Sequence, residues 1–374
     1  MKKLLAMLLA TAMTLGMVAC SSSAPSSQAP APSDAPSTSA PADSDPADDS
    51  QAPADTAAPG KKAAKDLNVA VSLGWLENES GQRQKYTYET EFAKYGITNY
   101  QIVDANYDPK KQSEQIEAFI KSKPDVLFVT ASDPVGIAEA VKHACDAGIP
   151  VFCDDALIPG AAAVSTVMFD NYKGGMWTMK QLVTKLGGKG KIAMIDLPSN
   201  EAWAERSHGA EFVLKQYPEI EVVQRWSWDS TGAVTPRMAI DNMLTACPNV
   251  GDLDAIWCAW DGAVFEGLEA CQAAGRNEIL FTGSDGGEHC FEVMKANPNF
   301  IATCGESIYT MASLCVEYAV KYMNGEAVPR IVMVPSIGIT NEMIVNTPVP
   351  EGWKNIGDYD IPGNYDVLGW DPTL

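Results

Sequence analysis

The segment VLFVTASDPVGIAEAVKHACDAGIPVFCDD (residues 126–155) contains one strand, one helix and a second strand. Val126 to Val129 is a continuous apolar run, which is the pattern of a strand buried on both faces. Asp133-Pro134 predicts a helix start, because Asp caps free N–H groups and Pro suits the first turn. Gly148 predicts the end of that helix, and Val151 to Cys153 predicts the next buried strand.

The same alternation of strand and helix extends in both directions from this segment. Further strands are expected at Leu67–Leu73, Tyr100–Val103, Lys191–Ile195, Glu221–Val223, Ala255–Cys258 and Ile279–Thr282. Short apolar strands that alternate with helices predict parallel sheets covered on both faces. About ten strands exceed one comfortable sheet. We therefore expect an α/β fold made of two doubly wound parallel-sheet lobes.

The N-terminus predicts export and a lipid anchor. Lys2 and Lys3 precede an apolar run, Leu4 to Val18, that is too short to span a membrane and has the length of a signal-peptide core. Ala19-Cys20 then resembles the cleavage box of bacterial lipoproteins. It implies a signal peptide over residues 1–19, acylation (palmitate) at Cys20 and attachment to the extracytoplasmic face of a cell membrane, here a Gram-positive surface. The alternative is an ordinary signal peptide with an incidental cysteine.

Residues 20–65 predict a disordered linker. From Ser21 to Ala64 the chain is built mainly of Ser, Ala, Pro, Asp, Gln and Thr and has no aromatic residue, so it cannot bury enough apolar surface to fold. The formal net charge of −21 argues against nucleic acid and against electrostatic docking on anionic lipid. The cysteines after Cys20 lack metal-ligand spacing, and unpaired core thiols are expected.

Polar residues that follow the expected strands indicate where a ligand would bind, because open parallel sheets bind ligands beyond the carboxyl ends of their strands. The acidic ones are Asp133, Asp155, Asp196, Asp229, Asp261 and Asp285. We interpret Asp133 as a helix cap and Asp196 as structural. Asp155 and Asp285 each closely follow an apolar strand in equivalent positions of the two lobes, and we interpret both as ligand-binding residues.

Over roughly residues 66–341, the chain resembles the periplasmic binding proteins of the ribose- and galactofuranose-binding type. The resemblance is carried, in order along the chain, by Val69–Ser72, Glu77–Arg83, Asp104 with Pro109–Gln112, Gly148–Asp155, Phe169–Asn171 with Gly174-Gly175, Glu205-Arg206, Trp228-Asp229, Trp260-Asp261, Gly283–Gly286 and Thr303–Glu306. It implies two similar lobes that close on a ligand and are joined by three crossings. The crossings are expected near Phe169–Tyr172, Gly305–Ser307 and Pro329–Val332.

The resemblance also implies domain boundaries. The N-terminal lobe is expected to comprise residues 66–170 and 307–330, and the C-terminal lobe residues 171–306 and 331–345. Residues 346–374 are expected to form a solvated C-terminal tail, in which the Asp358 and Asn364 regions give only a weak hint of calcium.

Carried over residue by residue, the resemblance implies ligand contacts at Asn78, Arg83, Asp155, Arg206, Trp228, Asp261, Asp285 and Glu306, and we add Trp260 as a candidate. Carboxylates can accept bonds from neighbouring hydroxyls, an Arg can donate to oxygens, and a Trp face packs on a sugar ring. Arg206 on spacing alone could equally be a surface charge, and Trp75 fits core or site. Two positions differ from the family pattern: Ala156 stands where many relatives have Arg, and Glu306 stands where the ribose type has an amide. We therefore do not expect the ligand to be ribose bound in the pose of the ribose type.

The implied function is a monomeric lipoprotein that captures a sugar or polyol and delivers it to the permease of an ABC importer. A ligand-presenting receptor for a signalling partner and a surface carbohydrate-active enzyme remain as alternatives. Gly187–Lys191 lacks P-loop spacing, and His143, His208 and His289 are scattered, so neither a cofactor nor a metal is expected.

Overall fold

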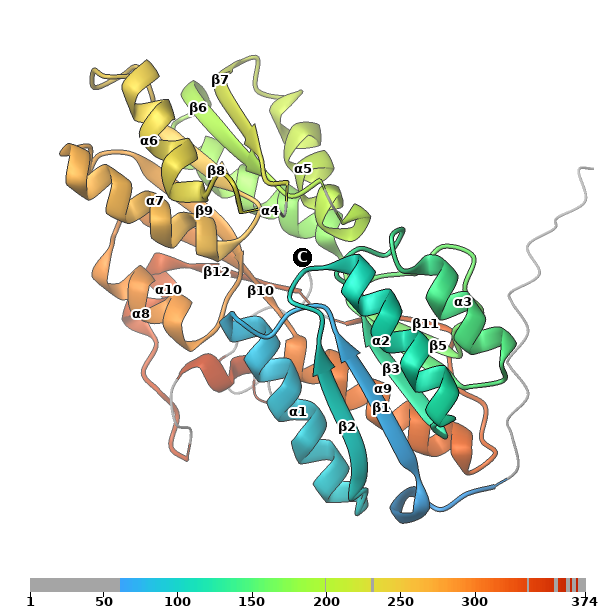
Figure 1. Cartoon of the computed structure of the whole chain (residues 1–374). Coiled ribbons are helices and arrows are strands. Elements are labelled where there is room, and N and C mark those ends of the chain that lie inside the picture. Colours follow the sequence, from blue (N-terminus) through green and yellow to red (C-terminus); the bar gives the residue numbers. More distant parts are fainter. Residues whose placement is uncertain are drawn as a thin grey trace, which may run out of the picture. The chain divides into compact units, whose positions relative to one another are not determined.

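The structure, a computed structural model, describes residues 61–198, 200–229, 232–334, 336–352, 356–360, 364 and 368. The expected signal peptide, Cys20 and nearly all of the expected linker lie outside these residues. Figure 1 shows the described chain as two groups of helices and strands.

The first lobe is built on a six-stranded parallel sheet. Its strands, in spatial order, are β11 (Ile331–Val334), β5 (Ser165–Phe169), β4 (Val151–Asp154), β3 (Val126–Thr130), β1 (Asn68–Leu73) and β2 (Asn99–Asp104). One face packs against α1 (Glu79–Tyr95) and α9 (Ile308–Met323), and the other against α2 (Pro109–Ser122) and α3 (Ala138–Asp146). A short 3-10 helix, η1 (Ala64–Asp66), precedes β1.

The second lobe repeats this arrangement with different residues. Its strands, in spatial order, are β12 (Ser336–Thr340), β10 (Phe300–Glu306), β9 (Leu280–Asp285), β8 (Ala255–Cys258), β6 (Lys189–Asp196) and β7 (Glu219–Ser227). Its helices are α4 (Asn171–Lys185), α5 (Glu201–Leu214), α6 (Pro236–Ala246), α7 (Asp261–Ala274), α8 (Glu288–Ala296) and α10 (Asn341–Asn346). β12 runs antiparallel to β10, whereas the other pairs of this sheet are parallel.

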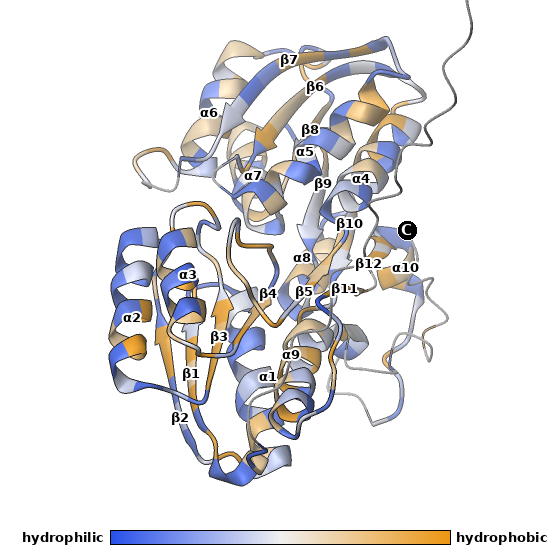
Figure 2. Ribbon diagram, turned by 90° about the vertical axis from the view of Figure 1, so that its right-hand side faces the viewer, coloured by the Kyte–Doolittle hydropathy of each residue, from blue (hydrophilic) through white to orange (hydrophobic). Residues whose placement is uncertain are grey.

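Burial explains why both sheets lie between helices. Every residue of β3 and β8 is buried, as expected for parallel strands covered on two faces. Figure 2 shows apolar colouring concentrated on β1 and β3, while α2 alternates between polar and apolar residues. Large rings fill the space between the layers, with Phe128 and Phe152 in the first lobe and Trp257 and Phe281 in the second fully buried. The two-lobed α/β fold expected from the sequence is confirmed.

The topology fixes where polar side chains gather. In each sheet the spatial order reverses beside the first strand, between β1 and β3 in one lobe and between β6 and β8 in the other. Parallel sheets of this kind bind ligands outside the carboxyl ends of the strands at that point. In Figure 1 the arrowheads of β1 and β2 point toward the second lobe, so the strand ends of the first lobe face the cleft.

The expected third crossing, near Pro329–Val332, is wrong by several residues. Ile331–Val334 pairs in parallel with β5 and so belongs to the first sheet, and the chain joins the second sheet only at Ser336. The expected start of the second lobe at residue 331 is wrong for the same reason. β11 and β12 are separated by a single residue, so the pairing of each strand, which the local sequence does not show, decides its sheet.

The expected solvated tail is also wrong for one part of the segment. The 3-10 helix η2 (Ile356–Asp360) buries Ile356 and Tyr359, and the Tyr359 ring lies 5.4 Å from that of Phe291 in α8. The Tyr359 hydroxyl donates to the backbone oxygen of Glu306 at 3.0 Å. This stretch therefore belongs to the hydrophobic core of the second lobe, where Ile356 and Tyr359 pack beside α8. The local sequence does not show this packing, because the partners lie far away in the chain.

Asp133 has the structural role expected of it, although the helix begins later. Its Oδ1 accepts from the backbone N–H groups of Val135 and Gly136 at 2.9 and 3.0 Å, and α3 starts at Ala138 rather than at Pro134. Asp196 is structural as well, since Ser207 donates to its carboxylate at 2.7 Å and Arg225 at 2.5 Å.

Candidate functional site

A buried arginine forms the centre of the site. Arg206, on α5, is 3 % exposed. Its Nε donates to Asn171 Oδ1 at 2.7 Å, and its Nη1 donates to the backbone oxygen of Ala259 at 2.8 Å and to Asp285 Oδ1 at 3.2 Å. Its Nη2 donates to Glu306 Oε1. The guanidinium thus joins the ends of β8, β9 and β10, and the alternative of a surface charge is wrong.

Two glycines allow α5 to approach α4 closely enough to hold Arg206 there. A Cβ built on Gly175 would lie 1.8 Å from the backbone oxygen of Arg206, and one on Gly209 would lie 1.9 Å from that of Tyr172. Both distances are far inside van der Waals contact, so a side chain at either position would push the helices apart. The close crossing of α4 and α5 directs the Arg206 side chain inward, toward the strand ends.

Burial dominates the electrostatics around this arginine. It raises the pKa of Asp285 to about 6, although Arg206 opposes the shift. It also raises the pKa of Glu306 well above its usual range, again against the effect of Arg206. Burial lowers the pKa of Arg206, but the carboxylates of Glu306 and Asp285 more than offset this and leave it raised. The arginine therefore stays charged, and burial raises the pKa of both its partners against the effect of its charge.

Asp261, the first residue of α7, holds the loop beyond β9. Its Oδ2 accepts from the backbone N–H of Gly286 at 2.7 Å, and its two oxygens each lie 2.9 Å from the donating Thr303 hydroxyl. Burial raises its pKa, and repulsion from Asp285 adds to the shift. Asp261 therefore positions the backbone next to Asp285 as well as lining the cavity.

The two strand-end aspartates both have a positive φ angle. Asp155 follows β4 with φ of 69°, and Asp285 ends β9 with φ of 124°. Positive φ is uncommon for residues with a side chain and concentrates at functional sites. Asp155 is 5 % exposed, and Trp203 Nε1 donates to its Oδ2 at 3.2 Å. The equivalent positions proposed from the sequence thus both have positive φ, with Asp285 farther from the left-handed helical region than Asp155.

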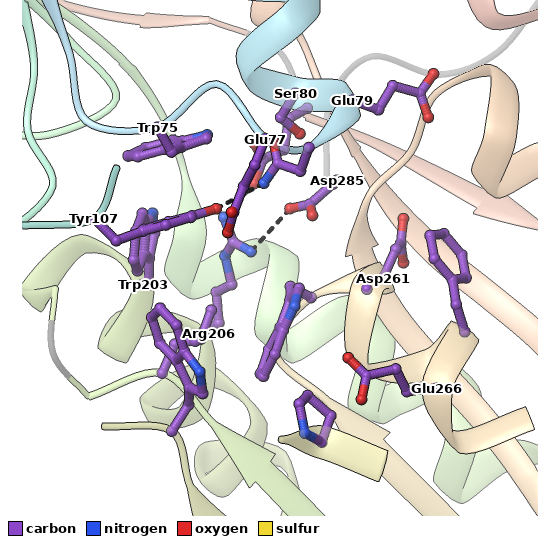
Figure 3. Close-up of a pocket in the computed structure, with 18 of the residues that line it drawn as sticks. Trp75, Glu77, Glu79, Ser80, Tyr107, Trp203, Arg206, Asp261, Glu266 and Asp285 are labelled. Carbon is purple, nitrogen blue, oxygen red and sulfur yellow. Dashed lines mark hydrogen bonds and ion pairs between the residues drawn. The ribbon is translucent and has the colours of Figure 1, made fainter. Parts of the chain in front are cut away.

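Aromatic rings from both lobes form the walls. The Trp75 and Tyr107 rings of the first lobe stack with centroids 5.6 Å apart. Trp203 of the second lobe meets Trp75 edge-on at 5.2 Å, and Trp228 meets Tyr107 edge-on at 5.5 Å. Trp260 lies 6.3 Å from Trp228. Figure 3 shows Trp75 and Tyr107 parallel on one side of the cavity, with Asp261 and Glu266 on the opposite side.

These groups enclose a cavity of about 370 Å³, within the size range of small-molecule sites. The lobes meet around it: Glu79 of α1 accepts from the backbone N–H groups of Glu288 and His289 at the start of α8, at 2.6 and 3.2 Å. The hydrogen bonds to Glu79 and the hydrogen bond from Trp203 to Asp155 connect the two lobes beside the cavity.

Eight of the nine residues expected to bind a ligand line this one cavity, namely Asn78, Asp155, Arg206, Trp228, Trp260, Asp261, Asp285 and Glu306. Arg83 is not among the described residues that line it. Its Nη2 donates to the backbone oxygen of Gly357 at 2.9 Å, and its guanidinium lies over the Tyr359 ring. The expectation for Arg83 is wrong because the folded-back C-terminal segment takes this side chain.

Sequence reasoning missed several lining residues: Glu77, Glu79, Tyr107, Trp203, Phe265 and Glu266. Two signals were present. Trp203 stands one helical turn before Arg206, so the two share a face of α5. Glu77 and Glu79 lie in the loop and helix start that resembled the family's ligand loop. Asn78 has a second use, since its side chain caps α1 by accepting from Gly81 N–H at 2.9 Å.

In the described part of the chain, no cluster of His, Cys, Asp and Glu has a geometry that would hold a metal ion. None of the helices described there has the length and apolar character needed to cross a membrane.

Two doubly wound lobes whose strand ends face a shared polar and aromatic cavity define a two-lobed solute-binding protein. The model of the family described as periplasmic binding protein domain matches residues 69–327, well over half of the chain, and the chain belongs to this family.

Individual relatives share about a quarter of their residues with this chain. The ribose import binding protein of Bacillus subtilis is 27 % identical over 272 residues, which cover 72 % of this chain and 86 % of that protein. The D-apiose import binding protein of Actinobacillus succinogenes is 26 % identical over 220 residues, covering 58 % and 69 %. The structure of an ABC sugar transporter subunit from Rhodobacter sphaeroides has a TM-score of 0.67 and 25 % identity, covering 74 % of this chain and 98 % of that one.

Proposed function

We propose that this protein captures a sugar or related polyol outside the cytoplasm and delivers it to an ABC importer. The observation that carries the proposal is the convergence of Asp155, Arg206, Asp285 and Glu306 on one enclosed cavity with aromatic walls. The names of the relatives, import binding proteins for ribose and D-apiose, support the same ligand class.

The chemistry of the cavity suits a polyhydroxylated ring. Asp155 and Asp285 can each accept hydrogen bonds from adjacent hydroxyls, and these charge-assisted bonds are stronger than neutral ones. The faces of Trp228 and Trp260 provide apolar surface for the C–H side of a ring. Because the polar groups are buried, an analogue that lacks a matching hydroxyl leaves one of them unpaired and is rejected.

A thermal-shift screen of the full chain against pentoses, hexoses, polyols and nucleosides tests this proposal. A specific ligand at about a hundred times its Kd should add roughly 2.7 kcal/mol to the free energy of unfolding. We expect stabilisation by members of the sugar or polyol class. Stabilisation only by nucleosides, or by no compound, would refute the proposed ligand class.

Lipidation at Cys20 and attachment to the outer face of the membrane are part of the proposal. Support comes from the apolar run that ends at Ala19-Cys20 and from the membership in a family of periplasmic binding proteins. A Cys20→Ser variant should leave the membrane fraction after processing. A monomeric state is also proposed, and light scattering of the purified chain measures it.

Binding rather than catalysis is the proposed use of the acidic residues. Asp285 and Glu306 both pair with Arg206, an arrangement that fixes them instead of placing them on opposite sides of a glycosidic bond. Chromatography of a sugar incubated with the protein should recover it unchanged. Deletion of the gene should abolish uptake of the ligand; a lost transcriptional response with normal uptake would favour the signalling receptor.

A further inference from the structure

The cavity carries an excess of acidic side chains over basic ones. Among the described residues that line it, seven side chains are carboxylic acids and one is a guanidinium. The acids are Glu77, Glu79, Asp155, Asp261, Glu266, Asp285 and Glu306, and the guanidinium is that of Arg206.

Partners within the protein account for most of these acids. Arg206 pairs with Asp285 and Glu306. Backbone N–H groups at the start of α8 bind Glu79, Gly286 N–H binds Asp261, and Arg237 N–H binds Glu266 at 2.7 Å.

Asp155 is different. It is 5 % exposed, and within the described residues Trp203 is the one donor to its carboxylate, at Oδ2. Its other oxygen, Oδ1, therefore lines the cavity without a donor from the described chain. Glu77 lies at the rim of the same cavity, close enough to Tyr107 to raise the pKa of its hydroxyl further, although burial is the larger cause.

The rings next to Asp155 also suit a cation. The face of a Trp or Tyr ring attracts an ammonium group, and the attraction increases when the pair is shielded from water. Trp203, which donates to Asp155, lies against Trp75, and Trp75 stacks on Tyr107. An amine bound at Asp155 would therefore lie in a cavity whose walls include these rings.

We propose that the ligand is a cationic polyol, an amino sugar or an aminated polyol, whose ammonium group binds Asp155. This inference rests on the proposed function, since it names the subclass of sugar or polyol that the same cavity takes. A buried carboxylate without a positive partner is costly, and a neutral hydroxyl brings no charge to offset that cost. Burial raises the pKa of Asp155, although the positive charge of Arg206, which pairs directly with Asp285 and Glu306, opposes the shift.

Calorimetric titration of the full chain with matched sets of sugars tests the inference. Each set contains a neutral parent, its amine and its N-acetyl derivative: D-glucose, D-glucosamine and N-acetyl-D-glucosamine, the corresponding D-galactose and D-mannose sets, and myo-inositol with its monoamine. The buffer is neutral, so that the amines remain largely protonated without acid that would neutralise the carboxylates of the cavity. In at least one set the amine should bind at least about tenfold tighter than the parent and the N-acetyl derivative.

The two proposals fail in different ways. Neutral parents that bind as tightly as their amines would overturn the cationic ligand and leave the sugar-binding function in place. A panel of which no member binds would overturn both.

A matched pair of variants locates the amine. Asp155→Asn removes the charge but keeps the size, and Asn tolerates the left-handed backbone at this position. It should reduce the preference for the amine over the parent to nearly one. Glu117→Gln makes the same charge change on α2, where Glu117 pairs with His143 outside the cavity, and should leave the preference unchanged. An equal loss of affinity for amine and parent in Asp155→Asn would show that Asp155 binds hydroxyls and would overturn the placement.

Discussion

The two walls of the cavity differ in how their polar groups are held. On the second-lobe side, Arg206, Asp285 and Glu306 form a buried network whose members are bonded to each other. On the first-lobe side, Asp155 accepts a hydrogen bond from a single donor, Trp203, and the stacked Trp75 and Tyr107 rings form part of the wall. The second lobe therefore offers a preorganised set of charges, whereas the first lobe contributes aromatic surface and the carboxylates of Glu77, Glu79 and Asp155.

The largest effect should follow from breaking the network of the second lobe. Arg206→Met leaves Asp285 and Glu306 buried without a cation. We expect a loss of roughly 3–5 kcal/mol in the free energy of unfolding and a more than hundredfold loss of ligand affinity. Urea denaturation and calorimetry measure the two quantities.

Arg225→Met is the matched control for this variant. Arg225 also pairs with two acids, Asp196 and Glu211, but its side chain is 42 % exposed and lies outside the cavity. Its loss should cost no more than about 1 kcal/mol in stability and leave the affinity as it was. Equal destabilisation by the two changes would contradict the difference between a buried and a surface network.

A second variant separates stability from binding within that network. Burial raises the pKa of Asp285 to about 6, so keeping it ionised at neutral pH costs stability. Asp285→Asn should therefore leave the ligand-free protein at least as stable as the wild type, while ligand affinity falls roughly tenfold to a hundredfold. Reduced stability together with unchanged affinity would reverse this interpretation.

The pH dependence of the free energy of unfolding should also show the cost of keeping buried carboxylates ionised. Burial raises the pKa of Asp154 and of Asp285 to about 6, whereas an Asp in the unfolded chain titrates at about 3.9. Between these values the folded protein binds more protons than the unfolded chain, so stability falls as the pH rises through this window. Each group contributes up to about 1.4 kcal/mol per pH unit and nothing further above its folded pKa.

Thermal unfolding of the ligand-free protein across this window measures the effect, and Asp285→Asn should give a shallower slope than the wild type. Stability that increases with pH over the window would exclude raised carboxyl pKa values as the dominant contribution.

The smallest effect is expected in the first-lobe wall. Tyr107→Phe keeps the ring stacked on Trp75 and removes the hydroxyl that accepts from Asn78 Nδ2 at 2.8 Å. This bond is exposed, so we expect a change of about 1 kcal/mol or less in ligand binding, a few-fold in Kd. Calorimetry measures it, and Tyr107→Ala, which removes the ring as well, should cost clearly more. Equal losses in the two variants would show that the hydroxyl rather than the ring is the important group.

Much of the fold could be predicted from the sequence, because short apolar strands that alternate with helices are compatible with few folds besides parallel sheets covered by helices. The position of the cavity at the carboxyl ends of the strands follows from that fold. Asp155 and Asp285 could be assigned to one cavity from their positions after strands alone. Arg83 and the C-terminal segment could not be assigned correctly, since the burial of Tyr359 beside α8 depends on contacts between residues far apart in the chain. β11 was placed in the wrong sheet because its partner, β5, is more than 160 residues away in the sequence.

The central claim is that one ligand bridges the strand ends of both lobes, and Asp155 tests it most directly because it is the buried carboxylate that the first lobe contributes to the cavity. Asp155→Asn is titrated by calorimetry with the tightest ligand of the sugar and polyol panel, with circular dichroism to confirm an unchanged fold. The account predicts at least about a tenfold loss of affinity, the equivalent of one charged hydrogen bond. Wild-type affinity in a folded Asp155→Asn protein would contradict it.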